Sequence, residues 1–163
     1  MRTLTLIALL ALTGCSGGSD SEGPTTPPLA ESYWAADAPK SALSPLEARE
    51  KGTEGTVWIH GKVGELASNR AQFQLVDPSY EACSENEDDT CATPWDFCCY
   101  SPEERARGSV IVQFRDSEGK LLQRDLQGFH GFDHLRQAWV RGKPERDDAG
   151  NLILVAEAIH VKE

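Results

Sequence analysis

Four cysteines that lie close together in the chain are the residues of this sequence best suited to chemistry. They are Cys83, Cys91, Cys98 and Cys99, and three of them belong to the run CATPWDFCC at residues 91–99. An even number of cysteines in an exported chain usually pairs into disulfides, and four cysteines allow three connectivities. A bond between the adjacent Cys98 and Cys99 would be strained, so each is expected to pair with one of the other two. The leading prediction is two disulfides that staple an irregular loop, with no cofactor.

The same thiols could instead bind zinc or a softer metal, since four thiolates can surround one tetrahedral ion. His130 and His134 are further candidate ligands, although the glycine between them removes the meaning that their spacing would have on a helix. Structural zinc sites usually take cysteines in pairs two to four residues apart, whereas the gaps here are seven, six and none. The spacing therefore favours disulfides over a metal site.

Nothing in the sequence argues for an enzyme, and no catalytic residue is assigned. The chain has no G-x-S-x-G, no H-E-x-x-H, no phosphate-binding loop and no dinucleotide fingerprint. A thiol oxidoreductase is the least favoured alternative, because no C-x-x-C occurs and acidic surroundings raise the pKa of a thiol. A binding or interaction module is the leading functional class, and a metal-binding or metal-handling protein is the alternative.

Trp95 and Asp96 lie between the cysteines and mark the candidate binding face. A tryptophan in such a loop either covers a small core or a disulfide, or serves as an exposed platform for a ligand. The adjacency of Cys98 and Cys99 next to this pair is the most unusual local feature of the sequence. If the protein has a site, we expect it here.

The N-terminus predicts export and lipidation. Residues 1–14 contain Arg2 and then an apolar run that is too short to cross a bilayer as a permanent helix, which is typical of a signal peptide. Two small residues followed by Cys15 resemble the bacterial lipobox, in which the cysteine is lipidated and becomes the mature N-terminus. Ser16 stands where an aspartate would favour inner-membrane retention in Gram-negative lipoproteins. The resemblance therefore implies a lipid-anchored protein of the cell envelope, at the outer membrane and facing the periplasm.

Residues 15–44 are predicted to be a flexible tether that begins at the lipidated cysteine. They are rich in serine, glycine, proline and threonine and show no sustained apolar period, so they cannot bury enough surface to offset the entropy of ordering. Tyr33 and Trp34 are the exception, because such a pair either packs back on the domain or stands in solvent.

The charge of the chain bears on its partners. The chain has 16 basic and 26 acidic residues, for a formal net charge of −10. A chain this acidic repels phosphate backbones, so nucleic acid is not an expected partner. The expected partners are the membrane, through the lipid anchor, and an envelope protein, a peptide or a glycan.

Residues 45–163 are long enough for one domain with its own core. Ser44 as N-cap, Pro45, Glu47 and Gly52 predict a short helix. Beyond it, apolar residues alternate with polar ones, which is typical of strands with one buried face. Strands are expected at 57–63, 72–75, 110–115, 120–126, 138–142 and 152–161, with a brief helical turn at 132–136.

Three residues inside these strands predict local irregularities. Glu157 interrupts the apolar phase of the last strand, and a bulge there would keep its charge out of the core. Gly61 and Gly142 lie in mid-strand and indicate bulges or tight bends where a side chain would crowd a crossing strand. We therefore interpret both glycines as structural and not as ligand contacts.

A sheet of short antiparallel strands avoids exposed edges by closing into a barrel. The predicted fold is all-β, an OB-fold-like closed antiparallel barrel of five to six strands with one or two short helices. The motifs PLEA at 45–48, VWIHGKVG at 57–64, FQLVD at 73–77 and VRGK at 140–143 resemble the bacterial exported OB-fold (BOF-like) proteins. This resemblance implies a fold and a general binding role. The usual short turn after the second strand is replaced by a cysteine-rich insertion at 78–107.

Overall fold

A computed structural model of the chain describes residues 26–51, 54–88 and 90–162. The predicted signal peptide at 1–14, the lipidation site at Cys15 and the first part of the predicted tether lie outside these residues.

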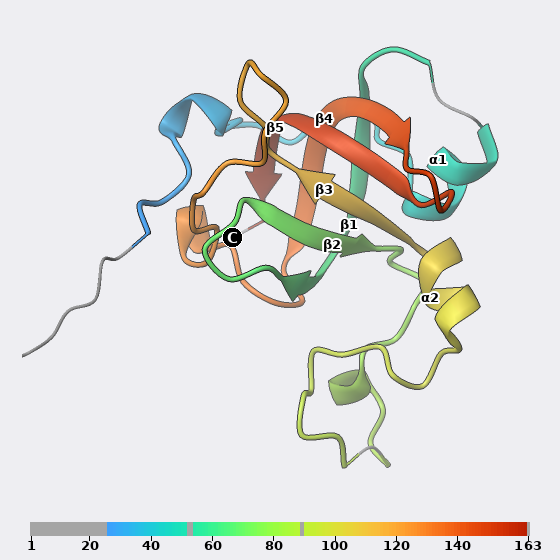
Figure 1. Ribbon diagram of the computed structural model, residues 1–163. Helices are drawn as coiled ribbons and strands as arrows, with labels where there is room; N and C mark the ends of the chain where they lie inside the picture. The colour runs from blue at the N-terminus through green and yellow to red at the C-terminus, as the bar shows by residue number, and fades with distance from the viewer. Residues whose placement is uncertain (1–25, 52–53, 89, 163) are drawn as a thin grey trace, which may run out of the picture.

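Five strands close into a barrel, as the sequence predicts. They are β1 (Val57–Leu66), β2 (Gln72–Val76), β3 (Ser109–Gln113), β4 (Gln137–Arg146) and β5 (Leu152–Val161). The order around the barrel is β1-β2-β3-β5-β4, with β4 returning to β1 (Figure 1). Four of the pairings are antiparallel, and β3 with β5 is the parallel pair. The OB-fold-like architecture is therefore confirmed.

The interior of the barrel is filled by the apolar phase of each strand. Alternate residues of a strand point to opposite faces, so one set from each strand lines the interior. Phe114 and Phe132 close one part of this core, and the ring of Phe132 meets that of Phe73 edge to face at 4.7 Å. The fully buried strand residues include Ile59, Val63, Leu75, Val110, Val112, Val140, Leu154 and Ile159.

The three predicted strand irregularities are found. Arg141 pairs with Ala158 and Gly142 with Ala156, so Glu157 is skipped in the β4–β5 register and forms the bulge. A Cβ on Gly142 would collide with the carbonyl oxygen of Val155. A Cβ on Gly61 would lie 2.5 Å from the carbonyl oxygen of Val76. Both glycines therefore permit close strand crossings.

Two short helices flank the barrel. In α1 (Pro45–Lys51), Ser44 and Glu47 form the expected capping box, with Ser44 N donating to Glu47 Oε2 at 2.9 Å and Glu47 N to Ser44 Oγ at 3.3 Å. The second helix, α2 (Pro102–Arg107), was not predicted and ends the insertion. The described residues also form three single-turn 3₁₀ helices: η1 (Glu31–Tyr33), η2 (Cys83–Glu85) and η3 (Phe129–Gly131).

The prediction of a strand at 120–126 is wrong. Its backbone hydrogen bonds go to several different segments instead of one ladder: Leu122 N donates to Phe114 O, Ala71 N to Leu122 O, and Asp125 N to Pro27 O. This segment therefore crosses one end of the barrel as a loop, and it buries Leu126 in the core.

The helical turn expected at 132–136 lies earlier in the chain, as η3. Gly128 and Gly131 have positive φ angles of 83° and 74° and bracket this turn. Phe132 follows with an extended backbone and is fully buried. Phe132 therefore belongs to the core and not to a helical turn, although the polar residues after it had indicated one.

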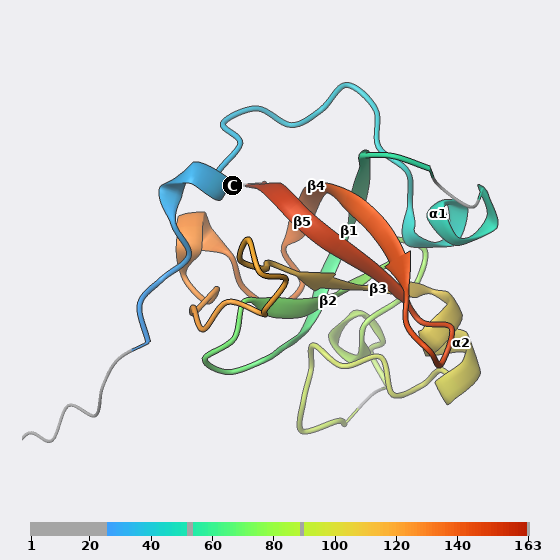
Figure 2. The same ribbon diagram turned by 45° about the horizontal axis from the view of Figure 1, so that its top comes forward.

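The prediction of a flexible tether is wrong for residues 27–43. Pro28 pairs with Asp125, Trp34 with Ile159 and Leu43 with Ile59 in isolated bridges, and Leu29 is buried in the core. Figure 2 shows this segment running past η1 and then across the barrel to α1. The apolar side chains scattered among its small residues are enough to hold it on the domain.

Trp34 is the centre of the contacts that hold this segment. Its indole stacks on the imidazole of His130 at 3.9 Å and on that of His160 at 5.4 Å. His160 Nδ1 donates to the carbonyl oxygen of Ala35 at 2.9 Å, and His130 Nε2 lies 2.8 Å from a carboxylate oxygen of Glu31. His130 is therefore engaged with the N-terminal segment.

Asp77, at the end of β2, joins the barrel to both α1 and the insertion. Its carboxylate accepts hydrogen bonds from Leu46 N at 3.1 Å, Ser79 N at 3.1 Å and Ser79 Oγ at 2.7 Å. Burial alone would raise the pKa of Asp77, but these hydrogen bonds and one from Ser44 outweigh it and hold the pKa below its usual value.

We expect Asp77→Asn to lower the free energy of unfolding by about 1 kcal/mol at pH 7, since hydrogen bonds to the charged carboxylate are lost. Because the folded pKa is depressed, this stabilisation is present above the unfolded pKa of about 4 and is lost as the pH falls through the folded value. Urea unfolding of the unaltered protein and of Asp77→Asn at a series of pH values measures this difference in stability. Asp148→Asn, in an exposed loop, is the control, and a difference that does not shrink at low pH would contradict the assignment.

Candidate functional site

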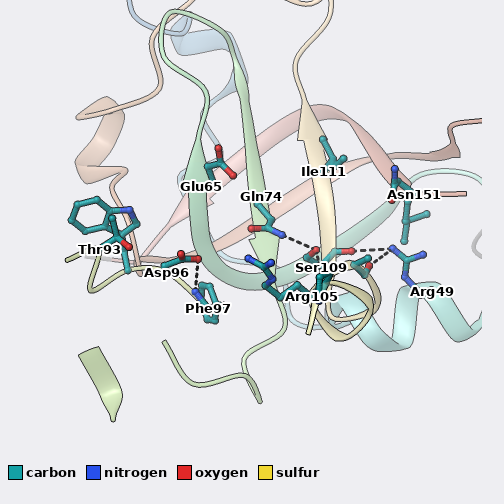
Figure 3. A pocket seen from close by; sticks show the side chains of 14 residues that line it. Arg49, Glu65, Gln74, Thr93, Asp96, Phe97, Arg105, Ser109, Ile111 and Asn151 are labelled. Atoms are coloured by element: carbon teal, nitrogen blue, oxygen red, sulfur yellow. Dashed lines mark hydrogen bonds between the residues drawn. The ribbon is translucent and has the colours of Figure 1, made fainter. Parts of the chain in front are cut away.

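A groove of about 600 Å³ lies between the outer face of the barrel and the cysteine-rich insertion. Its walls come from β1, β2, β3, both α-helices and the second half of the insertion (Figure 3). Both signs of charge and several neutral polar groups face it. The lining residues that matter here are Arg49, Glu65, Gln74, Trp95, Asp96, Arg105, Ser109, Ile111 and Asn151.

The barrel wall of the groove is the outward phase of β2 and β3. Gln74 Nε2 donates to Ser109 Oγ at 2.9 Å, and Ser109 Oγ donates to Arg105 O at 2.6 Å (Figure 3). A second hollow of about 220 Å³, lined by Gln72, shares Gln74 and Ile111 with the groove and extends it along β2. A row of amide side chains thus runs across the barrel surface.

Arg49 holds the helix side of the groove. Its Nη2 donates to the carbonyl oxygens of Ala106 at 2.7 Å and Ser109 at 3.2 Å. Burial, followed by the charge of Arg146, lowers the pKa of Arg49, which stays a cation because an arginine pKa starts above 12. Within the described part of the chain, the buried side-chain atoms without a hydrogen-bond partner are Nε of Arg49 and of Arg105. Two cations are thus held at the groove at an energetic cost, as occurs at binding sites.

The insertion supplies the opposite wall. Trp95 is 38% exposed, which is unusual for so large an apolar side chain, and its indole stacks on the imidazole of His134 at 4.7 Å. His134 Nδ1 donates to the carbonyl oxygen of Gly64 at 2.8 Å, so its ring is fixed to β1. Asp96 Oδ1 accepts from Phe97 N at 2.7 Å, and Phe97 is buried. The tryptophan is therefore an exposed platform with a fixed support.

An ion pair anchors the base of the insertion to the barrel. Lys62 Nζ on β1 lies 2.6 Å from Glu85 Oε2 and donates to Tyr80 O at 2.9 Å. The same Glu85 oxygen accepts from Ala82 N at 2.7 Å. Burial raises the pKa of Glu85, but the bonds from Lys62 and Ala82 outweigh it and lower the pKa overall. The insertion is thus held against one side of the barrel.

The four cysteines converge in the insertion. Cys83 Sγ lies 3.2 Å and Cys91 Sγ 3.7 Å from Cys98 Sγ. The thiol sulfurs of Cys83, Cys98 and Cys99 all lie within 4.8 Å of one another. The predicted disulfides are not confirmed, because these distances exceed the roughly 2.05 Å of an S–S bond and the described cysteines form no such bond here.

The surroundings of Cys91 and Cys98 shift the pKa of these two thiols in opposite directions. Hydrogen bonds from the side chain and backbone of Thr93, and then from Cys98, lower the pKa of Cys91. The contact with Cys83 lowers the pKa of Cys98, but the contact with Cys91, burial and the charges of Cys91 and Cys99 outweigh it and raise the pKa overall. Of these two thiols, Cys91 is therefore the one whose anion is better supported.

The predicted site residues fall into two groups. Trp95 and Asp96 line the groove, and the four cysteines form one cluster in the same insertion. Among the described residues the sulfur cluster includes no histidine: His134 lies under Trp95, and His130 contacts the N-terminal segment.

Arg49, Gln74, Arg105 and Asn151 belong to the groove and were not singled out from the sequence. The polar outward phase of β2 is the signal that could have found Gln74.

No helix among the described residues is long and apolar enough to span a bilayer. Comparison with models of known protein families and with curated proteins finds no match.

Proposed function

We propose that this protein is a non-enzymatic binding module of the bacterial cell envelope that holds a glycan in the groove between its barrel and its insertion. The observation that carries the proposal is the exposed Trp95 beside a groove lined by amide, carboxylate and guanidinium groups. An aromatic face packs against the apolar face of a sugar ring, while planar polar side chains hydrogen-bond its hydroxyl groups.

The position of the groove supports a glycan over two other ligand classes. The face of strands 2 and 3 is where OB-folds bind oligonucleotides and oligosaccharides, and the net charge of −10 disfavours the former. The closed barrel offers no sheet edge to which a peptide strand could add. Charged and amide side chains stand among the apolar ones in the groove, which suits a hydroxyl-bearing ligand better than the apolar side of an amphipathic helix. A neutral or amino-sugar chain fits the remaining chemistry best.

Anchoring at the membrane is the second part of the proposal. Lipidation of Cys15 and export to the outer membrane rest on the N-terminal sequence, and they would place the groove where envelope glycans are found. The binding role does not depend on whether disulfides or a metal close the cysteine cluster. Mass spectrometry of the N-terminal peptide checks the anchor: a diacylated Cys15 is expected, and an unmodified or absent Cys15 would contradict it.

An oligosaccharide array tests the binding function. The full chain, expressed in a Gram-negative host and extracted in mild detergent, is applied to neutral, amino-sugar and acidic oligosaccharides, with single-stranded DNA as the control ligand. We expect saturable binding to neutral or amino-sugar chains, with a dissociation constant in the micromolar to millimolar range (about −8 to −4 kcal/mol). Failure of every glycan to bind, or a preference for DNA, would refute the proposal.

A further inference from the structure

We propose that Cys83, Cys91, Cys98 and Cys99 form a thiolate site for one zinc ion, which fixes the insertion over the groove. The proposal goes beyond glycan binding and does not rest on it. It concerns the chemistry of the sulfur cluster alone.

The sulfurs of Cys83, Cys98 and Cys99 lie within 4.8 Å of one another, and Cys91 Sγ lies outside this group but 3.7 Å from Cys98 Sγ. In a tetrahedral site with Zn–S distances of about 2.3 Å, neighbouring sulfurs lie about 3.8 Å apart. The two closest separations in the cluster are 3.2 Å and 3.7 Å, and both involve Cys98. A disulfide uses one partner per sulfur, whereas Cys98 Sγ contacts two sulfurs at once and lies within 4.8 Å of a third. A shared central ion accounts for this arrangement.

The spacing of the cysteines along the sequence argues against a zinc site, but the fold brings their sulfurs together despite that spacing. The chain turns at residues 98–99, so the two adjacent cysteines both reach Cys83 within 4.8 Å. Cys83 is brought to them by two backbone hydrogen bonds across the insertion, from Cys83 N to Asp96 O at 2.8 Å and from Ser84 N to Pro94 O at 2.9 Å. Regular pairs of cysteines are therefore not needed to assemble the site.

Donors around Cys91 also fit a metal-bound thiolate. The hydroxyl oxygen of Thr93 lies 3.4 Å from Cys91 Sγ, and the Thr93 backbone N–H faces the same sulfur. Hydrogen bonds to the sulfur stabilise the anion and orient it, as the outer contacts of metal ligands do.

The insertion also needs a strong internal link. Its own apolar core consists of Val76, Ala82 and Phe97 with partly buried neighbours, and the regular structure of its described residues is a single-turn 3₁₀ helix and the short α2. Such a core cannot hold a loop of this length by itself. Zinc bound by four thiolates would supply the missing free energy, because the ion binds only where the folded insertion assembles its ligands.

Metal analysis combined with alkylation tests the proposal on the full chain, purified without reductant. We expect about one zinc per chain, with the four cysteines unreactive in the native protein and alkylated after EDTA in denaturant. Peptide mass spectrometry assigns each label, so Cys15 does not confuse the count. Cysteines that stay unreactive in EDTA and denaturant until a reductant is added are disulfides, and this result would overturn the proposal. Cysteines that are alkylated in the native protein without bound metal, or a stoichiometric metal other than zinc, would also overturn it.

A pair of variants locates the ion. Cys98→Ser removes the sulfur that contacts two others and is expected to abolish stoichiometric zinc. Ser84→Ala, in η2 next to Cys83, keeps every sulfur and is expected to leave the zinc content unchanged. Should Cys98→Ser fail to fold, cobalt(II) exchanged into the unaltered chain decides: tetrahedral thiolate coordination gives strong visible d–d bands, and their absence would contradict the site.

Discussion

Gly142→Ala is expected to lower the free energy of unfolding by about 3 kcal/mol, since overpacking at a site that cannot relax reaches this size. The added Cβ would collide with the carbonyl oxygen of Val155, and it would lie 2.9 Å from the carbonyl carbon of that residue and 3.0 Å from Ala156 Cα. All three are backbone atoms of β5, so β4 and β5 would have to separate beside the bulge at Glu157. Urea unfolding followed by far-UV circular dichroism measures the loss.

Gly64→Ala is the matched control for this substitution. The atoms nearest to its Cβ are Val76 Cγ2 at 3.1 Å and Gln74 Oε1 at 3.2 Å, which are side-chain ends that can shift. We expect a loss below about 1 kcal/mol for this variant. Equal losses for the two variants would show that the close crossing at Gly142 is not what makes glycine necessary there.

Trp95→Ala is expected to weaken glycan binding about 30-fold, which corresponds to about 2 kcal/mol for an aromatic residue at the centre of an interface. The indole is 38% exposed and is supported from behind by His134, so it is already oriented for a ligand. Trp95→Phe keeps a planar apolar face and should lose less affinity. Isothermal titration calorimetry with the best oligosaccharide of the array measures both variants.

Trp58→Ala is the control for the loss of a tryptophan. Trp58 lies on β1 with Arg141 5.9 Å over its ring, and it does not line the groove. We expect its affinity for the oligosaccharide to stay within about twofold of the unaltered protein. Equal losses at Trp58 and Trp95 would place the sugar elsewhere or point to a general loss of structure.

The strands that could be predicted are those with one buried face. The period of two located the last strand at 152–161, and the charge of Glu157 within it indicated the bulge, because a carboxylate cannot be buried unpaired in a barrel interior. The capping residues Ser44 and Glu47 similarly marked α1. In each of these cases local chemistry and the whole fold agree.

The rest depended on contacts distant in sequence. A strand was predicted at residues 120–126 because they follow the turn at 116–119, but their hydrogen bonds are divided among several segments, so no ladder forms. The segment at 27–43 has too few apolar residues to order itself, yet Leu29 and Trp34 find places on a barrel that the sequence does not display. The helix α2 could have been found, because Ser101, Pro102 and Glu104 repeat the signature of Ser44, Pro45 and Glu47.

The sequence indicated which kinds of residue form part of the candidate site, but it did not indicate how they are arranged in space. The cysteine-rich insertion and Trp95 were identifiable by composition, but the groove also takes Arg49 from α1 and Asn151 from the loop before β5. These residues meet only because the barrel order places their elements together. The cysteine gaps likewise argued against a shared ion, whereas the turn at 98–99 gathers the sulfurs.

Hydrogen exchange of the full chain with and without the highest-affinity oligosaccharide tests whether the groove between the barrel and the insertion holds the sugar. Bound sugar is expected to slow exchange at residues 72–76, 93–97 and 109–113, which form the two facing walls of the groove. Protection confined to other parts of the barrel, such as β4 at 137–146, or no protection at saturating sugar, would contradict the account.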